Sequence, residues 1–146
     1  MHIPDLIPIL QVAIGPVILI SGVGLLLLVM TNRFGRTVDR ARQVSLEVRS
    51  TSSGSKDGPR AQLNILLARA RTLRLAIAAA SVSALLAAVL VIVLFIGALL
   101  NLSFAVPIVG LFVSCLTALI VSLVLFIRDV NVSLKALRLE VGGDAD

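Results

Sequence analysis

The chain has 146 residues, is 58% hydrophobic, and has a mean hydropathy of +1.08. Soluble domains are roughly 45–50% apolar, so this composition excludes an ordinary water-soluble fold. The net charge is +5, with a single histidine and a single cysteine, so an intrachain disulfide and a zinc site of the usual spacing are also excluded.

The first predicted element is a membrane span at residues 7–30, because the segment is almost entirely apolar and exceeds the roughly 20 residues that a span needs. A cleaved signal peptide is disfavoured, since no Lys or Arg precedes the segment and no small-residue cleavage pattern follows it. Gly15 and Pro16 interrupt the span and predict a kink.

A basic segment at 31–74 follows, with a Ser- and Gly-rich turn at 50–58, and predicts a helical hairpin. Two further apolar segments at 75–100 and 106–127 predict the second and third spans, separated by an uncharged turn at 101–105. A helix at 128–141 completes the chain before a frayed tail. The predicted fold is an all-α, multi-pass membrane protein with one domain, 1–146, whose three transmembrane helices extend into a cytoplasmic helical bundle.

Ten of the thirteen Lys and Arg residues lie between Arg33 and Arg74, and none lies before Arg33 or in the 101–105 turn. Cytoplasmic loops of membrane proteins carry such an excess of positive charge. We therefore expect the amino terminus outside the cytoplasm and the hairpin and carboxyl terminus inside. The basic segment has few aromatic residues and adjoins apolar spans, so anionic lipid headgroups are the expected partner rather than nucleic acid.

Small residues recur every four positions on the second and third spans and predict close helix packing, within the chain or between copies. The rows are Ala76, Ala80, Ala84 and Ala88, and Gly110, Ser114, Ala118 and Ser122. Outside the bilayer, alternating spacings of three and four predict packed stripes. These are Phe34, Val38, Ala41, Ser45 and Val48; Leu63, Leu66, Ala70, Leu73 and Ile77; and Ile127, Val130, Leu134, Leu137 and Val141. Cys115 is expected as a small buried hydrophobe.

Charged and polar residues cluster where the apolar segments end, and we call them the charged collar: Asn32, Arg33, Arg36, Asp39, Arg40, Arg42, Arg74 and Asp129. Regular arginine spacing is typical of a voltage sensor, but these arginines begin where the apolar run stops. A solvated collar is the default expectation, with Asp39 bonded to Arg36 or Arg42. For Asp129 we expect a cationic partner among Arg33, Arg36 and Arg74.

The run from Asn32 to Arg42, preceded by Ile20-Ser21 and Gly24-Leu25-Leu26-Leu27 and followed by Leu73-Arg74, resembles a bacterial membrane family, domain of unknown function 2721. The resemblance extends through the segment 126–130, where it implies a glutamate in place of Asp129. It also implies a small protein of the bacterial inner membrane with three spans. The collar residues from Asn32 to Arg42 are the ones it singles out, without assigning them a task.

No phosphate-binding loop, zinc-protease motif or membrane-embedded pair of acids is present in the sequence, so an enzyme is not expected, and neither catalytic residues nor a cofactor is assigned. Two hypotheses remain. The first is a homo-oligomeric ion pore with a basic mouth, lined by the first span through Gln11, Gly15, Ser21, Gly24, Thr31 and Asn32. The second is a non-conducting scaffold or regulatory subunit whose hairpin binds anionic lipid or a cytoplasmic partner.

Overall fold

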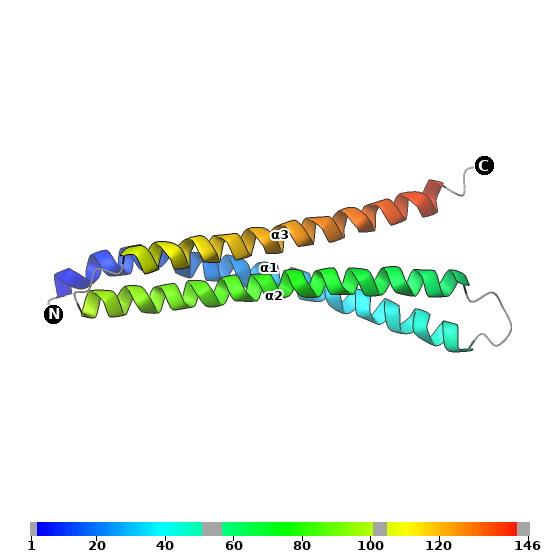
Figure 1. The fold of residues 1–146 in the computed structure, drawn as a ribbon, viewed down its shortest axis with the longest axis horizontal. Coiled ribbons are helices and arrows are strands. Elements are labelled where there is room, and N and C mark those ends of the chain that lie inside the picture. The colour runs from blue at the N-terminus through cyan, green and yellow to red at the C-terminus, as the bar shows by residue number, and fades with distance from the viewer. Residues whose placement is uncertain (1–2, 51–56, 101–104, 143–146) are drawn as a thin grey trace. The chain divides into compact units, whose positions relative to one another are not determined.

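The computed structural model describes residues 3–50, 57–100 and 105–142, and the side chains of 7–8, 10–50, 60–100 and 105–133. Three helices account for these ranges: α1 (Ile3–Ser50), α2 (Asp57–Leu99) and α3 (Ala105–Gly142) (Figure 1). Within the described ranges only Leu100 is not helical. The predicted all-α class is confirmed, as expected for apolar segments whose backbone groups can find no hydrogen-bond partner in lipid.

Each helix contains a stretch long and apolar enough to cross a membrane. The expected spans at 7–30 and 106–127 lie within α1 and α3, whereas α2 ends at Leu99, one residue before the expected limit. Helix α1 continues through Pro8 and Pro16, and the kink at Pro16 stays a prediction. The two expected turns fall mainly on 51–56 and 101–104, and the expected tail mainly on 143–146, all outside the described residues.

The contacts of the chain group into two compact units, each built from parts of all three helices. Unit 1 comprises Met1–Leu28 and Ala78–Ser122, and unit 2 comprises Val29–Ile77 and Leu123–Asp146. Every Lys and Arg of the sequence belongs to unit 2, whereas Asp5 is the only Asp, Glu, Lys or Arg in unit 1. All cationic residues of the chain are therefore in unit 2, and unit 1 is almost entirely uncharged.

Unit 1 is held together by small residues and by one reciprocal polar contact. Ser83 of α2 donates its hydroxyl to the carbonyl of Cys115 on α3 at 2.9 Å, and the Cys115 thiol donates to the carbonyl of Ser83 at 3.2 Å. Both side chains are buried. The expectation that Cys115 is buried is confirmed, but the thiol also acts as a hydrogen-bond donor between helices. A small residue on each side allows the two backbones to come this close.

The small-residue rows are only partly packed. On α2, Ala76 and Ala80 are buried, Ala84 is half-buried and Ala88 is exposed; on α3, Gly110 and Ser114 are exposed, Ala118 is half-buried and Ser122 is buried. Within the single chain the packed row departs from the predicted spacing of four, because each step of four residues turns about 40° beyond a full helical turn. Packing of the exposed members against another copy stays a prediction. The buried positions instead alternate steps of three and four, as in left-handed helix pairs, and they are Leu73, Ala76, Ala80, Ser83, Ala87 and Leu90 on α2.

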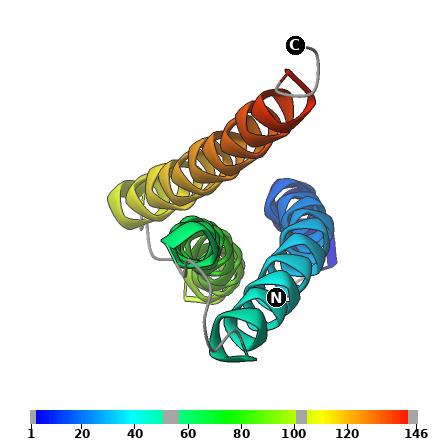
Figure 2. The same cartoon turned by 90° about the vertical axis from the view of Figure 1, so that its right-hand side faces the viewer.

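Unit 2 has a small apolar core between α1 and α2. Ala41, Val44 and Leu66 form its buried cluster, with Val48 and Leu63 packed against it. Figure 2 shows these parts of α1 and α2 end-on. The stripe predicted on α2 is confirmed at Leu63, Leu66, Ala70, Leu73 and Ile77, all of which are at least half-buried.

The stripe predicted on α1 is confirmed by the same measure, and only the stripe on α3 needs correction. The α1 stripe members are all at least half-buried: Phe34, Val38, Ala41, Ser45 and Val48. Thr37 and Val44 are buried beside them, although they were not predicted. Thr37 tolerates burial because its hydroxyl donates to the Arg33 carbonyl at 3.0 Å. On α3 Ile127 is exposed, Val130 is half-buried, and Asp129 takes the buried position between them. The predicted stripe positions Leu134, Leu137 and Val141 have side chains outside the described residues.

Candidate functional site

The candidate site in unit 2 is built around the side chain of Asp129. This side chain has 0% exposure, although it lies only two residues beyond an apolar span on α3. Oδ1 accepts a hydrogen bond from Nε of Arg69 on α2 at 3.4 Å, and Oδ2 lies 3.9 Å from Nη2 of Arg33 on α1. One carboxylate therefore joins all three helices through two arginines. A buried carboxylate requires such cationic partners, because its desolvation is otherwise very costly.

Neighbouring groups hold both arginines in place. Nη2 of Arg69 donates to the Ser133 hydroxyl, which in turn donates to the Asp129 carbonyl at 3.0 Å. The Arg33 guanidinium lies over the Phe126 ring, 5.4 Å from its centroid, within the range of a cation–π contact. Oδ2 of Asp129 is buried and makes no hydrogen bond among the described residues. The cluster is thus well supported on the Oδ1 side and loosely held on the Oδ2 side.

The structure confirms only part of the predicted pairing. Of the three candidate partners, Arg33 contacts Asp129, while Arg36 and Arg74 are exposed. Sequence reasoning missed Arg69. A signal was present, because Arg69 lies three residues after Leu66 and four before Leu73, which is the alternating spacing of the packed face of α2. Ala70, half-buried beside it, was assigned to that face instead.

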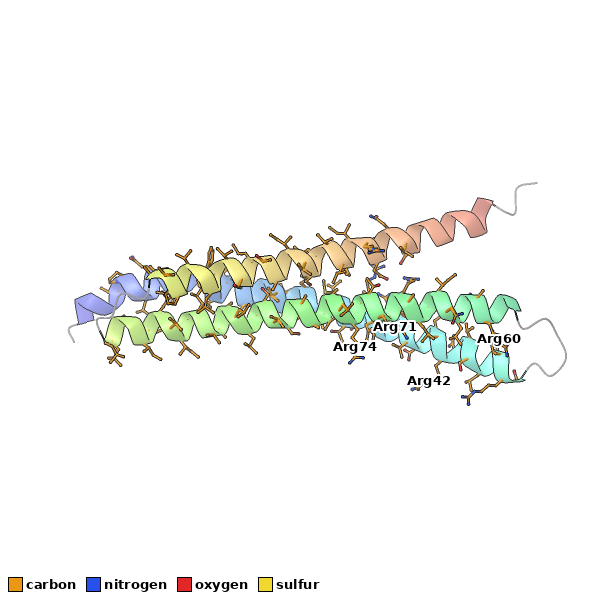
Figure 3. The ribbon with its side chains drawn as sticks, in the orientation of Figure 1. Arg42, Arg60, Arg71 and Arg74 are labelled. Atoms are coloured by element: carbon orange, nitrogen blue, oxygen red, sulfur yellow. The ribbon has the colours of Figure 1, made fainter. Side chains whose placement is uncertain are left out.

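The rest of the charged collar lies on the surface of unit 2. Asn32, Asp39, Arg40 and Arg42 are exposed, and Figure 3 shows Arg42 and Arg74 extending away from the helices. In the described part of the chain no ion pair joins Asp39 to Arg36 or Arg42, so the expected contact is not made. Arg40 instead reaches Gln43 at 3.5 Å. An exposed pair one helical turn apart gains little, because water screens both charges.

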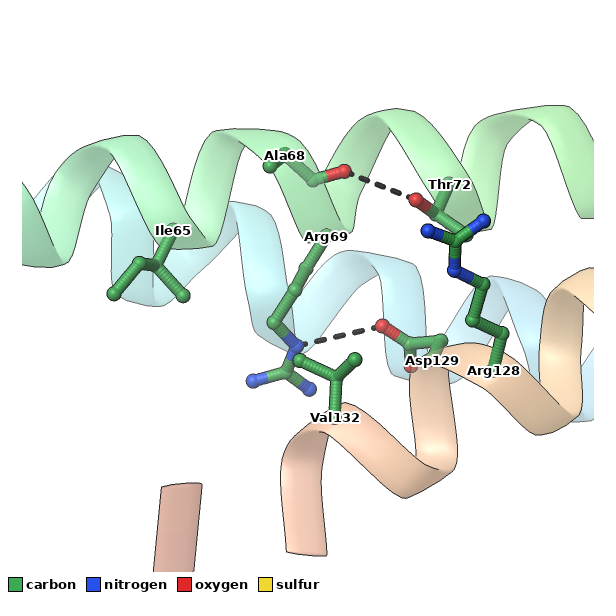
Figure 4. A pocket seen from close by; sticks show the side chains of 7 residues that line it. All are labelled: Ile65, Ala68, Arg69, Thr72, Arg128, Asp129 and Val132. Carbon is green, nitrogen blue, oxygen red and sulfur yellow. Dashed lines mark hydrogen bonds and ion pairs between the residues drawn. The ribbon is translucent and has the colours of Figure 1, made fainter. Parts of the chain in front are cut away.

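A pocket of about 250 Å³ lies beside the Asp129 cluster. Its wall contains Arg69 and Thr72 from α2 and Arg128 and Asp129 from α3, completed by Ile65, Ala68 and Val132. Figure 4 shows the Arg69 and Arg128 side chains on either side of the Asp129 carboxylate, with the Arg128 guanidinium directed toward Thr72. The Thr72 hydroxyl donates to the Ala68 carbonyl at 3.2 Å. The wall of the pocket therefore contains one arginine side chain from α2 and one from α3.

The proposed pore-lining residues are all exposed in the single chain: Gln11, Gly15, Ser21, Gly24 and Thr31. A Cβ atom at Gly15 or Gly24 would meet nothing within 4 Å. These two glycines are nine residues apart, which places them about 180° apart around a helix. Ser21 donates back to the Val17 carbonyl at 3.2 Å. The structure does not gather these residues on one side of α1.

A second cavity, of about 230 Å³, lies within unit 1 and is lined by Val12, Pro16, Leu90, Leu94, Ile108, Val109 and Phe112. Its lining side chains are all apolar, so none of them offers a hydrogen-bonding group to orient a ligand. Among the described residues no group of His, Cys, Asp and Glu side chains is arranged to hold a metal ion.

Three apolar helices, with one buried carboxylate held by two arginines where the apolar segments end, define an all-α, multi-pass membrane protein. Residues 13–139 match the family described as protein of unknown function (DUF2721), and the chain belongs to that family. The resemblance noted in the sequence is thereby confirmed. No curated protein and no solved structure matches the chain.

Proposed function

We propose that this is a non-catalytic membrane protein whose arginine-rich unit 2 binds anionic lipid headgroups at the cytoplasmic membrane surface. The observation that carries the proposal is the separation of charge: every Lys and Arg of the chain belongs to unit 2. Asp129 neutralises part of the charge of Arg33 and Arg69, but many arginines remain exposed: Arg36, Arg40, Arg42, Arg49, Arg60, Arg71, Arg74 and Arg128.

The magnitude of this attraction is sufficient for stable contact with lipid. Each Lys or Arg close to an anionic surface contributes about 1 kcal/mol, and the contribution disappears within a Debye length. Exposed acids on the described part of unit 2 are few, namely Asp39 and Glu47, so they offset only a small part of the positive charge. A few of the exposed arginines acting together would therefore enrich anionic lipid around the protein.

The test uses the full chain in nanodiscs that contain phosphatidylglycerol and phosphatidylcholine. We expect the phosphatidylglycerol probe to be enriched at the protein at low salt and much less so at about 1 M salt, where the Debye length is about 3 Å. Replacing Arg36, Arg40 and Arg42 together by Gln should reduce the enrichment. A matched triple replacement of the uncharged exposed residues Gln11, Ser21 and Thr31 by Ala should leave it unchanged. Equal distribution of both lipids around the wild-type chain would refute the proposal.

The homo-oligomeric pore is the second candidate, and the exposed small residues of α1 favour it. Gly15, Gly22 and Gly24 all face open space in the single chain, so another helix could approach closely at any of them. The mass of the native assembly together with ion flux from proteoliposomes tests this. Five or more copies with flux would support a pore, whereas a dimer or a silent bilayer at both signs of voltage would refute it. The spread of Gly15 and Gly24 around α1 places this candidate second.

A further inference from the structure

We propose that the pocket between Arg69 and Arg128 is a specific binding site for a phosphate group, supplied by the headgroup of an anionic phospholipid. The inference deepens the proposed function, on which it rests, by replacing diffuse attraction with one defined site. Its starting observation is that two arginine side chains from different helices line a pocket of about 250 Å³ in unit 2. Arginine is well suited to phosphate, because its planar fork of donors can contact two oxygens at once.

The local charge balance favours an anion. Arg33, Arg69 and Arg128 surround a single carboxylate, that of Asp129, and the first two already contact it. The cluster therefore keeps an excess of positive charge. Asp129 does not block the site, because its side chain is fully buried and both of its oxygens face arginines. The carboxylate acts instead as a positioning residue, since it fixes Arg69 through Nε.

The hydrogen-bond donors of the pocket are only partly used. Arg69 donates its Nε–H to Asp129 and one N–H of Nη2 to Ser133, and Nη1 has no partner among the described residues. Arg128 carries five N–H donors, and none of them bonds to a described residue. The Thr72 hydroxyl donates its proton to the Ala68 carbonyl of its own helix, so towards other groups it can act only as a hydrogen-bond acceptor. The unused donors are therefore those of the two guanidinium groups.

The position of the pocket in the chain identifies a lipid as the source of the phosphate. Arg128 directly follows the third apolar segment, which ends at Ile127, and Thr72 lies three residues before Leu75, where the second begins. Arg128 and Thr72 thus lie within one helical turn of the apolar spans, at the depth of the headgroups, and Arg69 lies six residues before Leu75, on the side away from the span.

Arg128→Gln is the test variant, because Arg128 is exposed and supports no ion pair among the described residues. Arg74→Gln is the matched control, since Arg74 is also exposed and directly precedes an apolar span, as Arg128 directly follows one, but Arg74 does not line the pocket. Native mass spectrometry of the full chain would measure how tightly phosphatidylglycerol is retained. Phosphatidylcholine and inorganic phosphate serve as separate arms.

We expect Arg128→Gln to weaken retention of phosphatidylglycerol by about tenfold or more, the effect of losing a hydrogen bond to a charged group. Arg74→Gln should weaken it by no more than about fivefold, the effect of one charge close to an anionic surface, and Arg128→Gln loses that contribution in addition to its hydrogen bond. Thermal unfolding in lipid-free detergent should be the same for both variants and the wild type. Tight retention of inorganic phosphate alone would keep a phosphate site but overturn its assignment to lipid.

Equal losses in Arg128→Gln and Arg74→Gln would overturn the specific site. If phosphatidylglycerol enrichment at low salt persisted in that case, the proposed function would stand without the site. Absence of any preference for phosphatidylglycerol over phosphatidylcholine in the wild type, with no retention of inorganic phosphate, would overturn both.

Discussion

Removing the charge of Asp129 tests whether its ion pairs hold the three helices of unit 2 together. Asp129→Asn keeps the size of the side chain but leaves Arg33 and Arg69 without their counter-charge. Breaking a fully buried ion pair by removing one partner costs about 3–5 kcal/mol, whereas an exposed pair contributes about 0–1 kcal/mol. The arginine side chains are 27% and 23% exposed, so water partly compensates both of them. We therefore expect a loss of about 2–3 kcal/mol, between these limits.

The assay is reversible unfolding of the full chain in mixed micelles, followed by helicity and by an interhelical distance probe. Asp39→Asn is the control, because Asp39 is exposed and makes no ion pair within the described residues. A double variant, Asp129→Asn with Arg69→Gln, should lose less stability than the sum of the single variants, because groups in direct contact are not additive. If Asp129→Asn were as stable as Asp39→Asn, the structural importance of the cluster would be refuted.

Three further predictions concern packing. Ser83→Ala removes the hydroxyl that bonds to the Cys115 carbonyl and should lower the free energy of unfolding by about 0.6–1.7 kcal/mol in the same assay. Ser21→Ala is the control and should cost nothing measurable, because that hydroxyl bonds within its own helix. Equal effects of the two variants would contradict the interhelical bond. Leu73→Ala, at a side chain with 0% exposure, should cost about 2–5 kcal/mol, against little for Leu67→Ala at 45% exposure. The Cys115 thiol, in a residue only 2% exposed, should resist maleimide in the folded protein and react on unfolding. Rapid labelling in mild detergent would show that α2 and α3 separate there.

The number and position of the helices could be predicted from the sequence because hydrophobicity and length are local properties. Residues 7–30 and 106–127 exceed the length of a span and contain no charge, so the expectation of helix needed no tertiary information. The same holds for the stripe from Leu63 to Ile77, whose spacing marks one face of a single helix.

Which residues face inward was harder to predict, because it depends on how the helices cross. A row of four-residue steps and a row of alternating steps share their first two members, Ala76 and Ala80, and separate only at Ser83 and Ala84. Apolar side chains in a membrane protein give no further help, since lipid accepts them as readily as a neighbouring helix does. One partner of Asp129, Arg33, was among those predicted, and the other, Arg69, was missed for a different reason: it carries a charge, and charged residues are not expected on a packed face.

The seven-residue spacing of Cys115, Ser122 and Asp129 along α3 makes this helix intolerant of changes in length. Each added or deleted residue would rotate everything beyond it by about 100°, so a single insertion after Ser122 would swing the carboxylate away from Arg69 while leaving the thiol contact intact. Homologous chains that keep both contacts should therefore differ in length in their connecting segments and tails, and not between these two anchor points.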